Sequence, residues 1–278
     1  MVKHENRPIE KFTAAAIQFC ANEDKDRNLR LASQYIDVAV QGGASVVVLP
    51  EMFNCCGHKE TMLKNAENIP GQTTDFLSDK ARTHGIKIVC GSIFERAENN
   101  KVYNTSVVLG SNGEILAKYS KIHLFDVDIP GKIRYKESEY VIAGSSIITV
   151  NMGSFEAGLA ICYDLRFCEL FRSLALKGAK IIFIPSAFTF ATGEYHWGPL
   201  VKARAIENQV FVVAANQIGT SPNNITCYGK SMIVDPWGRV PVKAEDDENV
   251  ITAEIDLNLL EDVRTEIPLF EHRRIDLY

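Results

Sequence analysis

The chain has 278 residues, of which 46% are hydrophobic and 23% are charged, a balance that is typical of a globular protein with a large core and excludes a disordered one. Its formal net charge is −5 and no lysine- or arginine-rich run is present, so it lacks the basic surface on which most nucleic-acid affinity depends. No window approaches the roughly 18 uninterrupted apolar residues of a membrane helix, and residues 1–12 are polar, without the apolar h-region of a signal peptide. We therefore expect no membrane partner and a cytoplasmic location.

Short apolar runs of strand length recur along the chain and alternate with amphipathic stretches. The runs predict strands over residues 13–19, 44–50, 86–94, 158–162, 179–185, 210–216 and 249–257. Residues 26–41 keep the apolar spacing of a helix, and Gly42 and Gly43 supply its stop. The same spacing from Phe167 to Leu174 predicts a helix that stops at Gly178. This alternation indicates an α/β protein.

Tight turns interrupt the alternation at SNG (111–113), NMGS (151–154) and DPWG (235–238). Each turn separates two strand-like runs and therefore predicts a β-hairpin. Hairpins among interior strands indicate mixed rather than purely parallel sheets. No linker rich in proline, glycine or serine divides the chain, so we predict one domain over residues 11–278 after a flexible tail of residues 1–10.

An internal echo relates two predicted strands. GASVVVLPEMF (43–53) and GAKIIFIPSAF (178–188) share glycine, alanine, an apolar run, proline and phenylalanine at matching positions. A helix, a glycine stop, a strand and a proline are a common succession, so coincidence is an alternative. A genuine echo predicts two similar halves whose strand ends meet at one edge, with Glu51 from one half and Ser186 from the other. A carboxylate at that rim needs a partner or a function unless it is a solvated loop residue.

The seven cysteines show neither the spacing of a disulfide framework nor that of a zinc site, and the six histidines lack metal-binding spacing, so no metal is expected. Cys162 ends a predicted strand just before a predicted helix. The helix dipole at such a position favours the thiolate, so Cys162 is a candidate nucleophile, with an inert buried cysteine as the alternative.

A cysteine nucleophile needs a base for its proton and a donor for the developing oxyanion. His123 lies in an apolar segment, so we expect it to be a packed, hydrogen-bonded histidine rather than the base. Glu51 is the other candidate base. Lys121 lies in a segment that passes from a strand into a loop, where its ammonium could reach a pocket or remain on the surface.

Three blocks resemble, in order, the signature blocks of the nitrilase or carbon-nitrogen hydrolase superfamily: VVVLPEMF (46–53), KYSKIHLFDVDIPGKIRYKES (118–138) and GLAICYDLRFCEL (158–170). Other family-like segments extend the resemblance over nearly the whole chain. It implies a four-layer αββα sandwich with mixed sheets and two similar halves, and at least a homodimer. It also implies a hydrolase of linear amides that needs neither a metal nor a cofactor.

Carried onto this sequence, the resemblance implies Cys162 as nucleophile, Glu51 as general base, Lys121 as cation, and Glu137 as a second glutamate that positions Lys121 and the substrate. The reaction it implies passes through a tetrahedral intermediate, whose oxyanion Lys121 and the Tyr163 N–H hold, and a thioester, and it releases ammonia.

The segments around Lys121 and Cys162 most resemble the Nit-type ω-amidases, which hydrolyse the terminal amide of short dicarboxylate monoamides such as α-ketoglutaramate and succinamate. Deaminated-glutathione amidases and N-carbamoyl amine amidohydrolases are alternatives, and a non-catalytic binding or scaffold protein on the same fold is a remoter one. One departure is Cys168, where the family usually has proline in the first turn of the next helix.

The substrate pocket is expected to contain a cation for a substrate carboxylate. Arg166 is the candidate, with a structural ion pair to Glu169 as the alternative. Further side chains are expected to line the pocket, the aromatic ones as walls and the hydroxyls as orienting groups: Tyr163, Phe53, Phe188 and Thr192.

Overall fold

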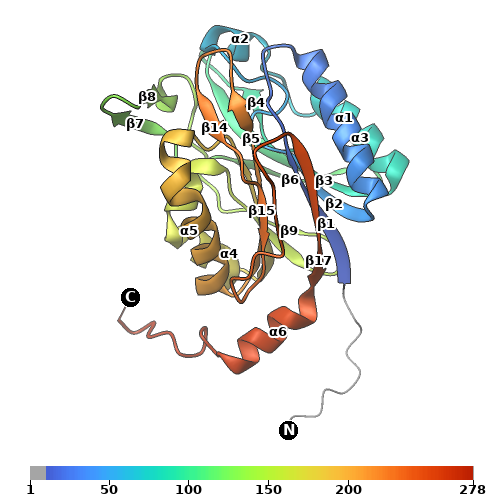
Figure 1. Cartoon of the computed structure of the whole chain (residues 1–278), viewed down its shortest axis with the longest axis vertical. Helices are drawn as coiled ribbons and strands as arrows, with labels where there is room; N and C mark the ends of the chain where they lie inside the picture. The colour runs from blue at the N-terminus through green and yellow to red at the C-terminus, as the bar shows by residue number, and fades with distance from the viewer. Residues whose placement is uncertain (1–10, 278) are drawn as a thin grey trace.

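Two β-sheets pack face to face, and two pairs of helices cover their outer faces (Figure 1). Helices α1 (Lys25–Gln41) and α3 (Gln72–His84) lie on one sheet, and α4 (Cys168–Leu176) and α5 (Phe190–Asn208) lie on the other. This computed structural model describes residues 11–277, so the tail predicted for residues 1–10 lies outside the described residues. The four layers are those of the predicted αββα sandwich.

The first sheet has seven strands, of which β1, β2 and β3 run parallel and the others antiparallel. Their order is β17 (Asn249–Asp256), β1 (Lys11–Gln18), β2 (Ala44–Val48), β3 (Lys87–Val89), β5 (Val102–Leu109) and β4 (Ile93–Arg96), with β6 (Ile115–Ser120) also paired to β5. The sheet is therefore mixed, as the hairpins indicate.

The second sheet has six strands with a parallel centre of β10, β11 and β12. Their order is β16 (Val242–Lys243), β15 (Met232–Val234), β12 (Phe211–Asn216), β11 (Ala179–Ser186), β10 (Glu156–Leu159) and β9 (Thr149–Asn151). The echoing segments correspond to β2 and β11, each of which follows a helix and pairs with a parallel strand on both sides. The two similar halves are thus present.

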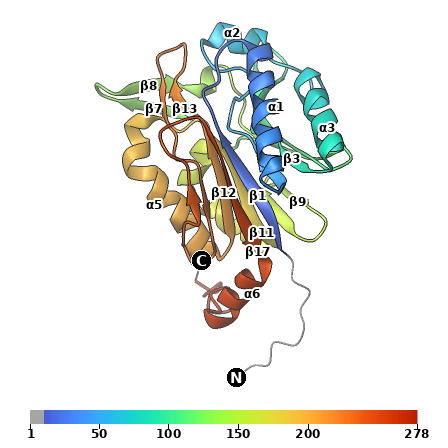
Figure 2. The same ribbon diagram turned by 45° about the vertical axis from the view of Figure 1, so that its right-hand side comes forward.

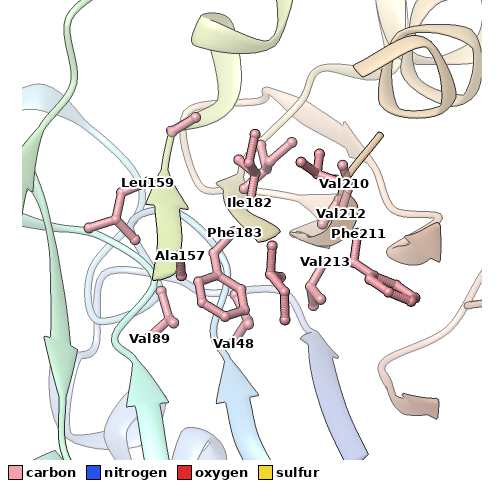
Figure 3. Close-up of a cluster of buried hydrophobic side chains, with 14 of the residues drawn as sticks. Val48, Val89, Ala157, Leu159, Ile182, Phe183, Val210, Phe211, Val212 and Val213 are labelled. Carbon is pink, nitrogen blue, oxygen red and sulfur yellow. The ribbon is translucent and has the colours of Figure 1, made fainter. Parts of the chain in front are cut away.

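The main core lies between the two sheets. Because successive strand residues point to opposite faces, Val46 and Val48 face the second sheet, whereas Val47 faces the helices. Figure 3 shows Val48 and Val89 opposite Ala157 and Phe183. Strands buried on both faces explain why the sequence shows continuous apolar runs rather than alternation.

Two small hairpins and a short helix gather at one end of the sheets, and α6 (Leu257–Glu266) lies at the other (Figures 1 and 2). The hairpins are β7 (Asp126–Ile129) with β8 (Ile133–Lys136) and β13 (Ile218–Thr220) with β14 (Thr226–Tyr228), and the short helix is α2 (Lys59–Lys64). None of the helices within residues 11–277 has the length and apolarity needed to span a membrane.

Most predicted elements are confirmed, including all three hairpins and the helices over 26–41 and after Phe167. Two strand predictions are corrected. Residues 86–94 form β3 and β4 rather than one strand, because the chain turns at Gly91 (φ 50°), where any Cβ would overlap the Pro50 carbonyl oxygen. The strand predicted over 158–162 ends at Leu159, and the 3₁₀ turn η2 (Cys162–Arg166) precedes α4.

Candidate active site

Glu51 joins the ends of the two echoing strands. Its N–H donates to the Ser186 carbonyl oxygen (3.3 Å), and its Oε2 accepts from the Ala187 N–H (2.8 Å). The Gln217 side chain donates to the Glu51 carbonyl oxygen (2.6 Å). The side chain of Glu51 is 2% exposed, so it is not a solvated loop residue. The edge predicted for the two halves therefore exists, and it places this carboxylate in the interior.

Lys121 lies one residue beyond β6 and binds both predicted glutamates. Its Nζ is 2.9 Å from Glu51 Oε1 and 2.9 Å from Oε2 of Glu137, which belongs to the 3₁₀ turn η1 (Glu137–Glu139). All three side chains are at most 4% exposed. Burial alone would lower the pKa of Lys121, but the carboxylates of Glu137 and Glu51 outweigh it and raise that pKa well above its ordinary value. Lys121 is therefore an ammonium ion, not a surface lysine.

Asn104 of β5 completes this cluster, although it is not among the residues predicted from the sequence. Its fully buried Nδ2 donates to Glu51 Oε1 (2.8 Å) and to Glu137 Oε1 (3.3 Å). One signal could have found it, because Asn104, Thr105 and Ser106 are consecutive polar residues inside the strand-like run that precedes the predicted turn at 111–113.

Replacing Asn104 by leucine is expected to lower kcat about 10- to 100-fold, because both carboxylates lose a donor that holds them in place. Ser106→Ala on the same strand is the matched control, since the buried Ser106 hydroxyl has no hydrogen-bond partner among residues 11–277. Steady-state kinetics and urea unfolding of both variants test this. A wild-type kcat in Asn104→Leu would contradict the positioning role.

Cys162 begins η2 and lies beside Glu51. Its backbone is in the left-handed region (φ 46°) and the residue is 7% exposed. The prediction of a thiolate favoured by a helix dipole is wrong, because α4 begins only at Cys168. Burial and the Glu51 carboxylate raise the pKa of the Cys162 thiol well above its ordinary value. The resting group is a thiol, so any nucleophilic role requires a base.

Asp164 holds the turn that carries Cys162. Its buried carboxylate accepts hydrogen bonds from the N–H of Ile161 (2.9 Å) and the hydroxyl of Tyr119 (2.6 Å), and from the backbone N–H of His123 (3.0 Å). Nδ1 of His123 lies 2.7 Å from it, so His123 is hydrogen-bonded, as predicted. The His123 ring also stacks on Phe167. These bonds offset the left-handed conformation of Cys162, which costs a non-glycine residue on the order of 1–3 kcal/mol.

One cavity is lined by Glu51, Lys121, Glu137 and Cys162 and by most of the predicted pocket residues. Tyr163, Phe188 and Thr192 line it together with Glu51, Lys121, Glu137, Cys162 and Arg166. Side chains that the sequence analysis did not assign come from four further regions of the chain: Met62 from α2, Phe125 and Tyr135 from the β7–β8 region, Thr189, and Ser221, Asn223, Ile225 and Cys227 from the β13–β14 region. No local pattern marks these residues.

Phe53 does not line this cavity, so that prediction is corrected. It is 0% exposed and belongs to the apolar cluster between the first sheet and helices α1 and α3. Met52 lines the cavity instead. The left-handed backbone of Met52 (φ 53°) turns the chain, and the next side chain enters the core.

Arg166 extends into the cavity without a carboxylate partner. Its guanidinium carbon lies 5.0 Å from the ring centroid of Phe188 and 5.6 Å from that of Tyr163. Among residues 11–277 no carboxylate forms an ion pair with it, and Glu169, the alternative partner, instead accepts from the Cys168 thiol (3.5 Å). The cavity therefore has a reactive cluster and a separate cation. Nowhere in the described part of the chain are three or more His, Cys, Asp or Glu side chains arranged to hold a metal ion.

Both the sequence and the structure of this chain resemble those of known proteins. The carbon-nitrogen hydrolase family model matches residues 13–265. The chain is 42% identical over 268 residues to the omega-amidase NIT2 of Xenopus tropicalis, covering 96% of this chain and 97% of that protein. The structure resembles the NitFhit protein of C. elegans (TM-score 0.90, 37% identity), covering 96% of this chain and 66% of that one. It also resembles Saccharomyces cerevisiae Nit3, a member of the nitrilase superfamily (TM-score 0.87, 33% identity), covering 97% and 99% of the two chains.

Proposed function

Because this chain belongs to the carbon-nitrogen hydrolase family and is an amidase, we propose that it cleaves a terminal carboxamide through a cysteine thioester, with short dicarboxylate monoamides such as succinamate and α-ketoglutaramate as substrates. One observation carries the proposal. The same cavity presents the Glu51–Lys121–Cys162 cluster and, apart from it, the Arg166 cation, which has no carboxylate partner within residues 11–277. Such a cavity can bind a molecule that has an amide at one end, next to Cys162, and a carboxylate at the other end, next to Arg166.

The first step is proton transfer from Cys162 to Glu51. Oε1 of Glu51 already accepts two hydrogen bonds, from Lys121 and Asn104, whereas Oε2 accepts one from the Ala187 N–H. Oε2 therefore has a lone pair for the thiol proton. The sulfur attacks the amide carbon, and the carbonyl oxygen becomes an oxyanion. Lys121, which has a third N–H beyond its two shortest bonds, and the Tyr163 N–H stabilise that oxyanion.

The second step releases ammonia and then the acid. Protonated Glu51 gives its proton to the amide nitrogen, the carbon–nitrogen bond breaks, and a thioester to Cys162 remains. Glu51 next takes a proton from water, whose oxygen attacks the thioester carbon. The carbon–sulfur bond breaks, Cys162 regains its proton, and the carboxylic acid leaves. Glu137 keeps Lys121 charged and in place throughout.

A panel of linear amides tests the substrate class. We expect the highest kcat/KM, measured as ammonia release, for succinamate and α-ketoglutaramate. A preference for deaminated glutathione or for an N-carbamoyl amine would support the alternative amidases. Failure to release ammonia from every linear amide would instead favour a non-catalytic protein.

Replacing Arg166 by methionine is expected to raise KM for succinamate about 10- to 100-fold, because a charge-assisted hydrogen bond to the substrate is lost. Succinamide, in which an uncharged amide replaces the carboxylate, should keep its KM within about threefold. The KM of Arg166→Lys for succinamate should lie between the values of wild type and Arg166→Met, because lysine keeps the charge but lacks the planar fork. Equal changes for both substrates would argue against carboxylate binding by Arg166.

A further inference from the structure

The one side-chain hydrogen bond of Arg166 within residues 11–277 joins it to a histidine. Arg166 Nη1 lies 3.0 Å from Nδ1 of His196, which belongs to α5 and does not line the cavity. A guanidinium group has donors and no acceptor, so Nδ1 must accept. His196 is then neutral, with its proton on Nε2. The observed position of Arg166 therefore depends on the protonation state of His196.

We propose that His196 is a positioning residue that, when neutral, holds Arg166 in the cavity for the substrate carboxylate and, when protonated, releases it. This inference rests on the proposed function, because it concerns recognition of the substrate carboxylate. It adds a pH dependence of binding that the catalytic cluster does not supply.

Protonation of His196 has two opposing effects. It places an N–H and a positive charge against a cation at hydrogen-bond distance, so the contact with Arg166 is lost. It also adds a positive charge that attracts the anionic substrate. His196 is exposed, so solvent screens that attraction over the longer distance to the cavity. The direct contact dominates, and substrate affinity should fall.

The charged surroundings of His196 come from its own helix and from the elements packed against α5, which are η2, α4, β12, β14 and β15. Besides Arg166, their titratable groups are Cys162, Tyr163 and Asp164 of η2, Cys168, Glu169 and Arg172 of α4, Cys227 and Tyr228 of β14, and Glu194, Tyr195, Lys202, Arg204 and Glu207 of α5. Partial desolvation of the ring and the charge of Arg166 lower the pKa of His196 below its ordinary value of 6.5. His196 is thus neutral at pH 7 and becomes protonated as the pH falls through that lowered pKa.

The test compares KM for succinamate and for succinamide near pH 7.5 and near pH 5. The succinamate carboxylate stays ionised over most of this range, since such groups titrate at about 4.3. We expect KM for succinamate to rise about tenfold at the lower pH. KM for succinamide should stay constant, and any change in kcat should be shared by both substrates because it belongs to the catalytic cluster.

Two variants separate positioning from a general structural effect. His196→Gln keeps an acceptor that cannot be protonated and should hold KM for succinamate low at both pH values. His196→Ala has no acceptor for Arg166 and should show a high KM for succinamate at both pH values. Calorimetric binding of succinamate to the Cys162→Ala protein at the two pH values tests the same point without turnover. Absence of hydrolysis would reject the proposed function alone, whereas a pH dependence of binding or of KM that persists in His196→Gln would overturn this inference.

Discussion

Replacing Cys162 by alanine is expected to lower kcat for amide hydrolysis by about 10⁴-fold or more, because the proposed thioester then cannot form. Cys162→Ser should be nearly as inactive. The raised pKa of the thiol shows that this site disfavours an anion, and a serine hydroxyl ionises far less readily than a thiol. Ammonia release is the assay, and mass spectrometry of rapidly quenched wild-type enzyme should detect the covalent acyl adduct on Cys162.

Two other thiols provide matched controls. Cys56 and Cys227 line the same cavity, and burial raises the pKa of Cys56 to about 12. Within residues 11–277 neither is hydrogen-bonded to Lys121. Neither is assigned a role, so Cys56→Ala and Cys227→Ala should keep kcat within about tenfold. Near wild-type turnover in Cys162→Ala would refute the nucleophile assignment, as would an acyl adduct on either control cysteine.

Replacing Lys121 by methionine is expected to remove activity and to lower the free energy of unfolding by about 3–5 kcal/mol, because Glu51 and Glu137 then remain buried without their cation. In wild type the pKa of Lys121 lies above its ordinary value of 10.5, so this lysine stays charged between pH 5 and pH 8 in both folded and unfolded chains. It therefore contributes no pH dependence to stability over that window.

The variant should behave differently. A buried carboxylate without a cation binds a proton more tightly in the folded state, so its folded pKa is raised, and the stability that the proton supplies is lost as pH rises through that pKa. Lys121→Met should thus be closer to wild type near pH 5 than near pH 8 in urea unfolding. Lys118→Met is the control, because Lys118 lies on β6 three residues before Lys121, with its side chain 40% exposed and paired with Glu95. This substitution should lower the free energy of unfolding by about 1 kcal/mol or less. If the two variants had equal free energies of unfolding, Glu51 and Glu137 would not need the Lys121 cation for the stability of the folded protein, and the prediction would be wrong.

Local patterns predicted most elements of the fold because each strand and helix needs a particular spacing of apolar residues. The exceptions arose where a contact distant in sequence decides the backbone. Residues 86–94 are mostly apolar, yet the chain turns at Gly91, where it passes close to the Pro50 carbonyl oxygen. Cys162 was placed at the end of a strand, whereas the bonds that Asp164 accepts, one of them from Tyr119 of β6, hold it in a separate turn.

Glu51 and Cys162 each follow an apolar run in the sequence, and Lys121 lies where a predicted strand passes into a loop. All three match a family block. The structure brings these three residues together, but no local sequence pattern identifies the other residues that line the cavity. Phe53 and Met52 are adjacent apolar residues, and only the backbone turn at Met52 decides which of them lines the cavity.

The sequence by itself determined the family, confirmed over nearly the whole chain, the αββα layers, and the three residues around which the site is built. The tertiary structure decided the protonation of Cys162 and Lys121, because burial and neighbouring charges exist only after folding. It also decided the partner of Arg166. The candidate partner Glu169 lies three residues away in the chain, whereas the actual partner, His196, comes from α5. Hydrophobic spacing is a local property of the chain, whereas charge compensation depends on which distant side chains the packed sheets bring into contact.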